Sequence, residues 1–315
     1  MDRQTRASLQ QLDRRLQADY NNTARQVLRQ NRAALERLAD FDESLYLNYT
    51  EEQLAVERVA HYEREARRSG VLYAIAVAIA LCGARSARAI QAEGANVFRG
   101  GYAESLRFVN NQLARGVSIP TATQAQLRIL QSQAPQSPFT QVAYGRLGIN
   151  SALAQQNIVN RLQNQVKTAI INGEGIDGVT QRIRNVTQAS FNDARRIART
   201  ETGRLANQGR DAAWQQSNDL GIVTDKIWVH TGMSQEPREA HVAMNGQVFG
   251  SDGYFTLPNG EKARYPSDPK LSPGQAINCT CTFTVRVRSP QGVTQSYIEN
   301  ARRVLASDLA GGITR

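Results

Sequence analysis

The sequence predicts an α+β protein in which a long N-terminal helical region precedes a smaller domain of helices packed on a short antiparallel sheet. Aromatic residues make up only 6% of the 315 residues, which is typical of chains richer in helix than in sheet. Apolar residues follow a helical period as far as Asn218 and alternate with polar residues after Gly221. Strands that follow a run of helices favour α+β over a βαβ fold.

The N-terminal half is predicted to be helical. Residues 2–38 contain neither proline nor glycine and carry leucines at helical spacing. A second helix is expected over residues 43–68, or from Thr50 onward, because Thr50-Glu-Glu-Gln53 has the form of a capping box. Further helices are predicted over residues 71–92, 96–115 and 121–133. Two prolines in Ala134-Pro-Gln-Ser-Pro138 indicate a linker. We therefore predict a helical region over residues 1–135 and a linker over 136–150.

The second half begins with helices and ends with strands. Helices are predicted over residues 151–171, 178–183 and 190–218. Gly203 and Gly209 lie inside the last of these and indicate either a close backbone contact or a kink. Strands are predicted over residues 226–230, 246–249 and 279–287. A hairpin with an Asn-Gly turn is predicted over residues 252–260, and a last helix over residues 296–309.

The chain is basic, with a net charge of +10. Residues 101–200 hold eleven Lys or Arg and four Asp or Glu, a net of +7. Such a segment permits contact with nucleic acid or with an acidic protein. A solvated helix surface is the alternative.

Three observations concern the compartment and the membrane. Three cysteines, an odd and small number, argue against a disulfide scaffold. The polar residues 1–12 predict no secretory signal. The apolar run at residues 71–82 falls short of the roughly 18 residues that cross a bilayer, so a buried helix is favoured over a membrane-active segment.

Motifs in the second half occur in a characteristic order. They are Ile197-Ala-Arg-Thr-Glu-Thr-Gly-Arg204 with Asn207, then Ile227-Trp228, then Arg238-Glu-Ala-His241 with Met244-Asn-Gly246, and finally Ile277-Asn-Cys-Thr-Cys281. Their order and spacing resemble the phage Mu F-like minor head protein family, whose domain would cover residues 151–288. Residues 289–315 would form a C-terminal helical tail.

The resemblance implies a structural minor head protein of a tailed phage, without catalytic residues, that aids head assembly, genome delivery and DNA ejection. It implies a place in the virion head near the portal, and in the host cytoplasm during assembly. The implied partners are the portal protein, the major capsid or scaffolding protein, and packaged double-stranded DNA, without stable membrane insertion. Residues 1–135 would dock on the portal or capsid. A sequence-independent nucleic-acid-binding accessory protein and a metal-dependent hydrolase are the alternatives.

The motif residues are predicted to form a polar network between helix and sheet. They are Arg199, Glu201, Arg204, Asn207, Trp228, Arg238, His241, Gly246 and Asn278. Glu201, Arg204 and Asn207 follow one another at three-residue steps and share a helix face. We expect them to be buried against Asn278 and Thr280. An exposed Glu201–Arg204 pair is the alternative.

Cys279 and Cys281 should point the same way from a strand. With His241 and His230 they could bind zinc as a Cys2His2 site. Core packing beside Phe283 is favoured instead, because Cys-x-Cys is an unusual ligand spacing and reduced cysteine packs as a small apolar residue. We therefore predict no cofactor.

Overall fold

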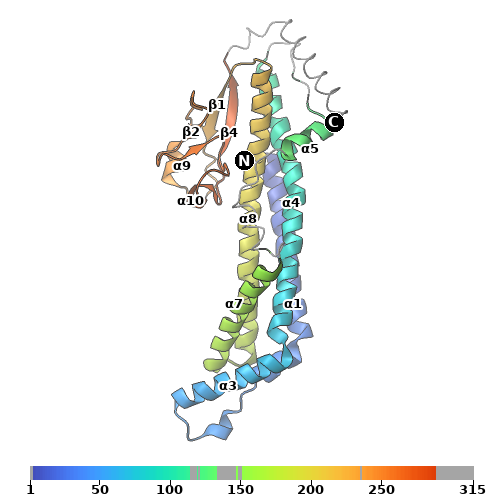
Figure 1. Ribbon diagram of the computed structural model, residues 1–315, viewed down its shortest axis with the longest axis vertical. Coiled ribbons are helices and arrows are strands. Elements are labelled where there is room, and N and C mark those ends of the chain that lie inside the picture. The colour runs from blue at the N-terminus through green and yellow to red at the C-terminus, as the bar shows by residue number, and fades with distance from the viewer. Residues whose placement is uncertain are drawn as a thin grey trace. The chain divides into compact units, whose positions relative to one another are not determined.

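The computed structural model describes residues 3–113, 119, 121–132, 147, 151–234 and 236–288. The predicted linker lies outside these residues except for Leu147, and so do the predicted helix over 296–309 and the tail that contains it. The chain forms an α+β fold in which helices dominate and the strands are short and antiparallel (Figure 1).

The chain divides into two compact units. We call Met1–Gln10, Gln91–Phe139 and Ala198–Arg315 the strand-bearing unit, and Gln11–Ile90 with Thr140–Ile197 the helical unit. Each unit is built from segments far apart in the sequence, whereas the regions predicted from the sequence follow one another along the chain. The reason is that three long helices each contribute residues to both units.

The N-terminal helices agree with prediction except at one break. α1 (Arg3–Gln30) and α2 (Arg32–Ala39) are separated at Asn31, where a single helix was predicted. The Asn31 side chain donates a hydrogen bond to the carbonyl of Val27 (2.8 Å) and competes with the helical backbone bonds. A 3-10 turn, η1 (Glu43–Tyr46), follows.

α3 (Glu51–Ser69) begins at the later of its two predicted starts. The backbone N–H of Thr50 donates to Gln53 Oε1 (2.8 Å), and the N–H of Gln53 donates to Thr50 Oγ1 (3.3 Å). These two bonds form the predicted capping box and satisfy two backbone donors that a helix start leaves without partners. Gly70 ends the helix in the left-handed conformation, with φ of 58°.

Two predicted gaps between helices are filled. α4 (Val71–Gln112) is one helix where two were predicted, and α8 (Gly175–Asp219) likewise joins two predicted helices. Within the strand-bearing unit, a Cβ atom at Gly209 of α8 would lie 2.1 Å from the carbonyl oxygen of Phe98 in α4. The glycines therefore allow close backbone contact and do not end the helices.

Two other helices, α5 (Gln124–Ser132) and α7 (Ser151–Ile171), lie close to their predicted positions. Two short helices, α9 (Glu239–Ala243) and α10 (Pro273–Ala276), were not predicted from the sequence. By length and apolar composition, α4 is the one helix in the described part of the chain that could cross a membrane, but 56% of its most apolar window is buried. This burial agrees with the predicted core helix.

Two antiparallel strand pairs form the sheets. β1 (Thr224–Val229) pairs with β4 (Thr282–Val287) (Figure 1). The register sets Val229 opposite Thr282. β2 (Phe255–Thr256) pairs with β3 (Lys262–Ala263) and forms the predicted hairpin, with its turn at Asn259-Gly260. The predicted strand over 246–249 is reduced to one bridge between Val248 and Ile227.

β4 is shorter than predicted. It begins at Thr282 and not at Cys279, because β1 ends at Val229 and Asn278 adopts a positive φ of 56°. The burial pattern still alternates through this region. Cys279, Cys281, Phe283, Val285 and Val287 are all buried. They join α4 residues such as Phe98 and Tyr102 in the core of the strand-bearing unit.

Candidate functional site

One face of α8 carries buried polar side chains toward the strands. Asn207 donates hydrogen bonds to the carbonyls of Pro266 (2.9 Å) and Cys281 (3.0 Å), and its Oδ1 accepts one from Thr282 Oγ1 (2.8 Å). Both ends of its amide are therefore bonded, as a buried amide requires. These bonds fix the start of β4 against the helix.

Glu201 and Arg204 form a buried ion pair one turn earlier on the same helix. The Arg204 guanidinium donates from Nε (3.0 Å) and Nη2 (2.7 Å) to Glu201 Oε2. The two residues are only 1% and 7% exposed. The arrangement is therefore the buried one expected from the helix face, and not the exposed pair.

The sequence interpretation missed a buried lysine beside this network. Lys226 of β1 forms an ion pair with Asp211 of α8, and its Nζ also donates to the Arg264 carbonyl (2.6 Å). The ammonium lies 4.4 Å from the ring centre of Trp214 and 4.3 Å from that of Phe249. Burial lowers the pKa of Lys226 to about 8, although Asp211 opposes the shift. The sequence interpretation placed Lys226 at the start of a predicted strand and did not assign its side chain to a face.

A second cluster lies where β1 ends and β4 begins. Because Val229 pairs with Thr282, the next residues on each strand, His230 and Cys281, come to lie side by side. His230 Nδ1 is 3.5 Å from Cys281 Sγ. His241, on α9, is buried with its Nδ1 3.4 Å from Cys279 Sγ and 3.6 Å from Cys281 Sγ. The ligand atoms of His241, Cys279 and Cys281 all lie within 4.8 Å of one another.

The His241 ring is oriented by two neighbours. Its Nε2 lies 2.9 Å from Gln275 Oε1 on α10, and this oxygen can only accept a hydrogen bond. Nε2 therefore carries the proton and Nδ1 presents its lone pair to the two sulfurs. The ring of Trp228 packs edge-on against His241, with ring centres 5.7 Å apart.

The two thiols differ in acidity. A hydrogen bond from Cys281 holds the pKa of Cys279 well below its ordinary value, against the opposite effect of burial, and His241 adds to the lowering. The same bond and burial raise the pKa of Cys281. Cys279 is therefore the more acidic of the two thiols.

The remaining motif residues hold the loops around this cluster. Arg238 donates from Nη2 to the Ile277 carbonyl (2.6 Å) and ties α9 to the segment before β4. Gly246 has a positive φ of 82° and donates its N–H to the Trp228 carbonyl. Asn278 is exposed, and its backbone N–H bonds to Thr200 Oγ1 (3.1 Å). Arg199 is exposed on α8.

Neither predicted sheet partner joins the Asn207 network. Asn278 faces solvent, and Thr280 bonds to Thr231 instead. The helix face meets the strand through Thr282 and the Cys281 carbonyl. The difference follows from the start of β4, which brings residues 281 and 282, not 278 and 280, level with Asn207.

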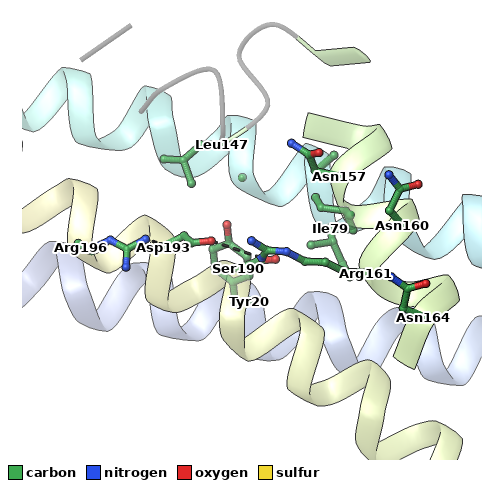
Figure 2. A pocket seen from close by; sticks show the side chains of 13 residues that line it. Tyr20, Ile79, Leu147, Asn157, Asn160, Arg161, Asn164, Ser190, Asp193 and Arg196 are labelled. Carbon is green, nitrogen blue, oxygen red and sulfur yellow. Dashed lines mark hydrogen bonds and ion pairs between the residues drawn. The ribbon is translucent and has the colours of Figure 1, made fainter. Parts of the chain in front are cut away.

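The helical unit contains a polar pocket of about 510 Å³. Figure 2 shows Asn157, Asn160 and Asn164 of α7 along one side, with Asp193 and Arg196 of α8 on another. Arg196 forms an ion pair with Asp193. The asparagine amides offer hydrogen bonds, and Arg161 and Arg196 share the single carboxylate of Asp193, so these side chains carry one net positive charge.

Several arginines of the basic segment are engaged in ion pairs. Within residues 151–200 these are Arg161 and Arg196 with Asp193, Arg182 with Glu174, and Arg195 with Asp13. These pairs reduce the positive charge that this stretch offers to a phosphate backbone.

Comparison with known proteins relates the second half of the chain to phage proteins. Residues 160–284 match the family model described as phage Mu protein F like protein. The chain is 31% identical to YqbB of Bacillus subtilis over 130 residues, which are 41% of this chain and 42% of that protein. It is 25% identical to the minor head protein GP7 of Bacillus phage SPP1 over 151 residues, 48% of this chain and 46% of that protein.

A further relative carries the name of an enzyme. The chain is 28% identical over 141 residues to the NAD(+)–arginine ADP-ribosyltransferase EFV of Enterococcus faecalis, covering 45% of this chain and 28% of that protein. The matches thus span less than half of the length of each of these three relatives. No solved structure matches the chain.

Proposed function

Because residues 160–284 carry a domain of the phage Mu protein F-like family, we propose that this chain is a structural minor head protein that acts in head morphogenesis by binding other head components. The observation that carries the proposal is the match of this domain to the family together with the likeness to a phage minor head protein. Its buried helix–strand contacts suit a rigid binding module, because a satisfied polar network fixes one packing arrangement.

The portal protein is the partner we propose for the N-terminal helical region. The segment around η1 exposes apolar side chains, with Leu45 75% and Leu47 85% exposed. Val56 of α3 is also exposed, at 66%. Adjacent exposed apolar residues are typical of protein interaction sites. In this proposal the segment contacts the portal, the chain resides in the virion head, and it is in the host cytoplasm while heads assemble.

Co-purification tests this contact. The full chain and a portal protein from the same genome are co-expressed, and the complex is captured through the portal. Leu45→Glu with Leu47→Glu should abolish capture, whereas Leu81→Glu, at an exposed position of α4 (53%), should retain it. Purified heads should contain the wild-type chain. Heads that never contain it would refute the structural role, and capture unchanged by the double variant would refute the η1 contact.

A DNA contact is the second candidate, favoured by the net charge of +7 between residues 101 and 200. We propose weak, sequence-independent binding to packaged duplex DNA, weak because the ion pairs above occupy several arginines. Fluorescence anisotropy of a labelled duplex should show affinity falling as salt rises, with a shallow slope that reflects few phosphate contacts. No binding at low salt would exclude the contact.

The ADP-ribosyltransferase relative raises a catalytic alternative. We propose that the shared segment is not the catalytic part, since it accounts for 28% of that enzyme's length. Incubation of the full chain with NAD⁺ and an arginine-rich acceptor should then yield no ADP-ribosylated product. If the acceptor is modified, and if this modification is lost when a residue within 160–284 is substituted, the chain is an enzyme.

A further inference from the structure

We propose that Cys279, Cys281, His241 and His230 bind one Zn²⁺ ion that fastens the end of the β1–β4 pair. This inference is independent of the function in the phage head. It reverses the preference for simple core packing that the sequence suggested, on the strength of the geometry of the four side chains.

The distances between the ligand atoms of His241, Cys279 and Cys281 fit three corners of a tetrahedral zinc site. His230 contacts only Cys281 of these three, so its side chain would move toward the ion to become the fourth ligand. With Zn–S of about 2.3 Å and Zn–N of about 2.0–2.1 Å, a tetrahedron has N···S edges of about 3.6 Å. The three N···S distances in the cluster are 3.4, 3.5 and 3.6 Å. An ion at the centre would therefore need no large movement of His241 or of the two cysteines.

The imidazole of His241 is set up as a metal ligand. Its Nε2 proton is held by Gln275 Oε1, so a single lone pair on Nδ1 faces two sulfur atoms. One lone pair accepts only one strong hydrogen bond, so Nδ1 cannot accept from both thiols at once. A cation bound by Nδ1 and both sulfur atoms better explains why the two cysteines converge on this nitrogen. A ligating histidine typically donates its other ring N–H to an oxygen in this way.

Trp228 supplies a second, independent observation. Its indole N–H is buried and has no hydrogen-bond partner in the described part of the chain. A buried donor without an acceptor is destabilising, and a metal-bound thiolate of Cys281 would be the acceptor that this N–H lacks.

The site would be structural. Its ligands come from the end of β1, from α9 and from the segment before β4, and four protein ligands leave no position for a reacting water. The ion would therefore join three loops whose ligands are up to 51 residues apart in the sequence. Because the entropic cost of closing a loop grows with its length, a metal that closes long loops stabilises a small sheet most.

Cobalt substitution and metal analysis test the proposal on the full chain. Protein purified in the presence of Zn²⁺ should retain about one equivalent after dialysis. The apo form titrated with Co²⁺ should show the intense visible absorption of tetrahedral cobalt together with thiolate-to-cobalt charge transfer. Chelator should lower the melting temperature of the wild type and release the metal in the same titration.

Matched variants separate this site from general effects of losing a cysteine or histidine. Cys279→Ala, Cys281→Ala and His241→Ala should each abolish stoichiometric binding. Cys82→Ala, at a buried cysteine of α4, and His61→Ala, on α3, should leave one equivalent bound. His230→Ala should weaken binding without abolishing it, since His230 approaches one of the sulfurs from a partly exposed position.

Wild-type results alone decide the matter if the variants fail to fold. Folded wild-type protein that remains free of zinc and shows no cobalt bands with reduced thiols would overturn the proposal and leave the cysteines as core residues. Cobalt bands unchanged in the Cys279→Ala and Cys281→Ala variants would overturn it as well, because the metal would then lie elsewhere.

Discussion

Replacing Gly209 with alanine tests whether α4 and α8 meet backbone to backbone in the strand-bearing unit. A Cβ atom at position 209 would lie 2.1 Å from the carbonyl oxygen of Phe98 and 3.0 Å from the backbone nitrogen of Tyr102. The contact is reciprocal, because a Cβ at Gly101 would lie 2.2 Å from the carbonyl oxygen of Ala206. In each case the obstacle is backbone, which cannot rotate away.

Two opposing effects set the magnitude. Alanine is favoured over glycine inside a helix by about 1 kcal/mol. Overpacking costs about 1–3 kcal/mol, and a clash with backbone belongs at the upper end because the helices must separate. We therefore expect Gly209→Ala and Gly101→Ala each to lower the free energy of unfolding by about 2 kcal/mol net.

Gly94→Ala is the matched control on α4. Its Cβ would lie 2.5 Å from Cδ1 of Leu205, the end of a flexible side chain that can change rotamer. The stability of this variant should stay within about 1 kcal/mol of the wild type. Urea titrations followed by tryptophan fluorescence report on this unit, because both tryptophans, Trp214 and Trp228, belong to it. A Gly209→Ala variant as stable as the wild type, at an unchanged m value, would refute the close helix contact.

Other substitutions test the strands, the buried lysine and the helix cap. Phe283→Ala removes a buried core ring and should cost about 3–5 kcal/mol in the same titration; a loss below about 1 kcal/mol would contradict its core position. Burial lowers the pKa of Lys226 to about 8 from 10.5, so between these values the unfolded chain binds more protons than the folded one. The free energy of unfolding of the wild type minus that of Lys226→Met should therefore rise between pH 8 and pH 10.5 and be lower below pH 8. A difference that does not change with pH would contradict the lowered pKa. Thr50→Ala breaks the α3 capping box and should cost about 1 kcal/mol in thermal melts, while Thr50→Ser should retain the cap.

The elements that the sequence predicted well have local causes. The helix over residues 151–171 shows an apolar period, and Thr50 and Gln53 satisfy each other's backbone within a single turn. The alternation that places Cys281 and Phe283 on the core side is likewise local, because successive side chains of an extended chain point to opposite faces.

The continuity of α4 and α8 depended on tertiary contacts. A glycine inside a helical pattern weakens the helix. Gly94 lies in the gap that was predicted within α4, whereas Gly209 was predicted to lie inside a helix, and both lie where other residues come close. Burial of the surrounding apolar residues outweighs the intrinsic preference of a single glycine for a turn.

The features of the candidate metal centre likewise have either local or distant causes. The sequence by itself determined that Cys279 and Cys281 face one side, since their spacing of two residues is the period of an extended chain. Only the tertiary structure decided that His241, 38 residues before Cys279, presents Nδ1 to both sulfurs and holds its other nitrogen against Gln275. It also decided that Lys226 is buried over aromatic rings. Periodicity reports which way a side chain points, whereas the partner it meets is set by the packing of segments far apart in the chain.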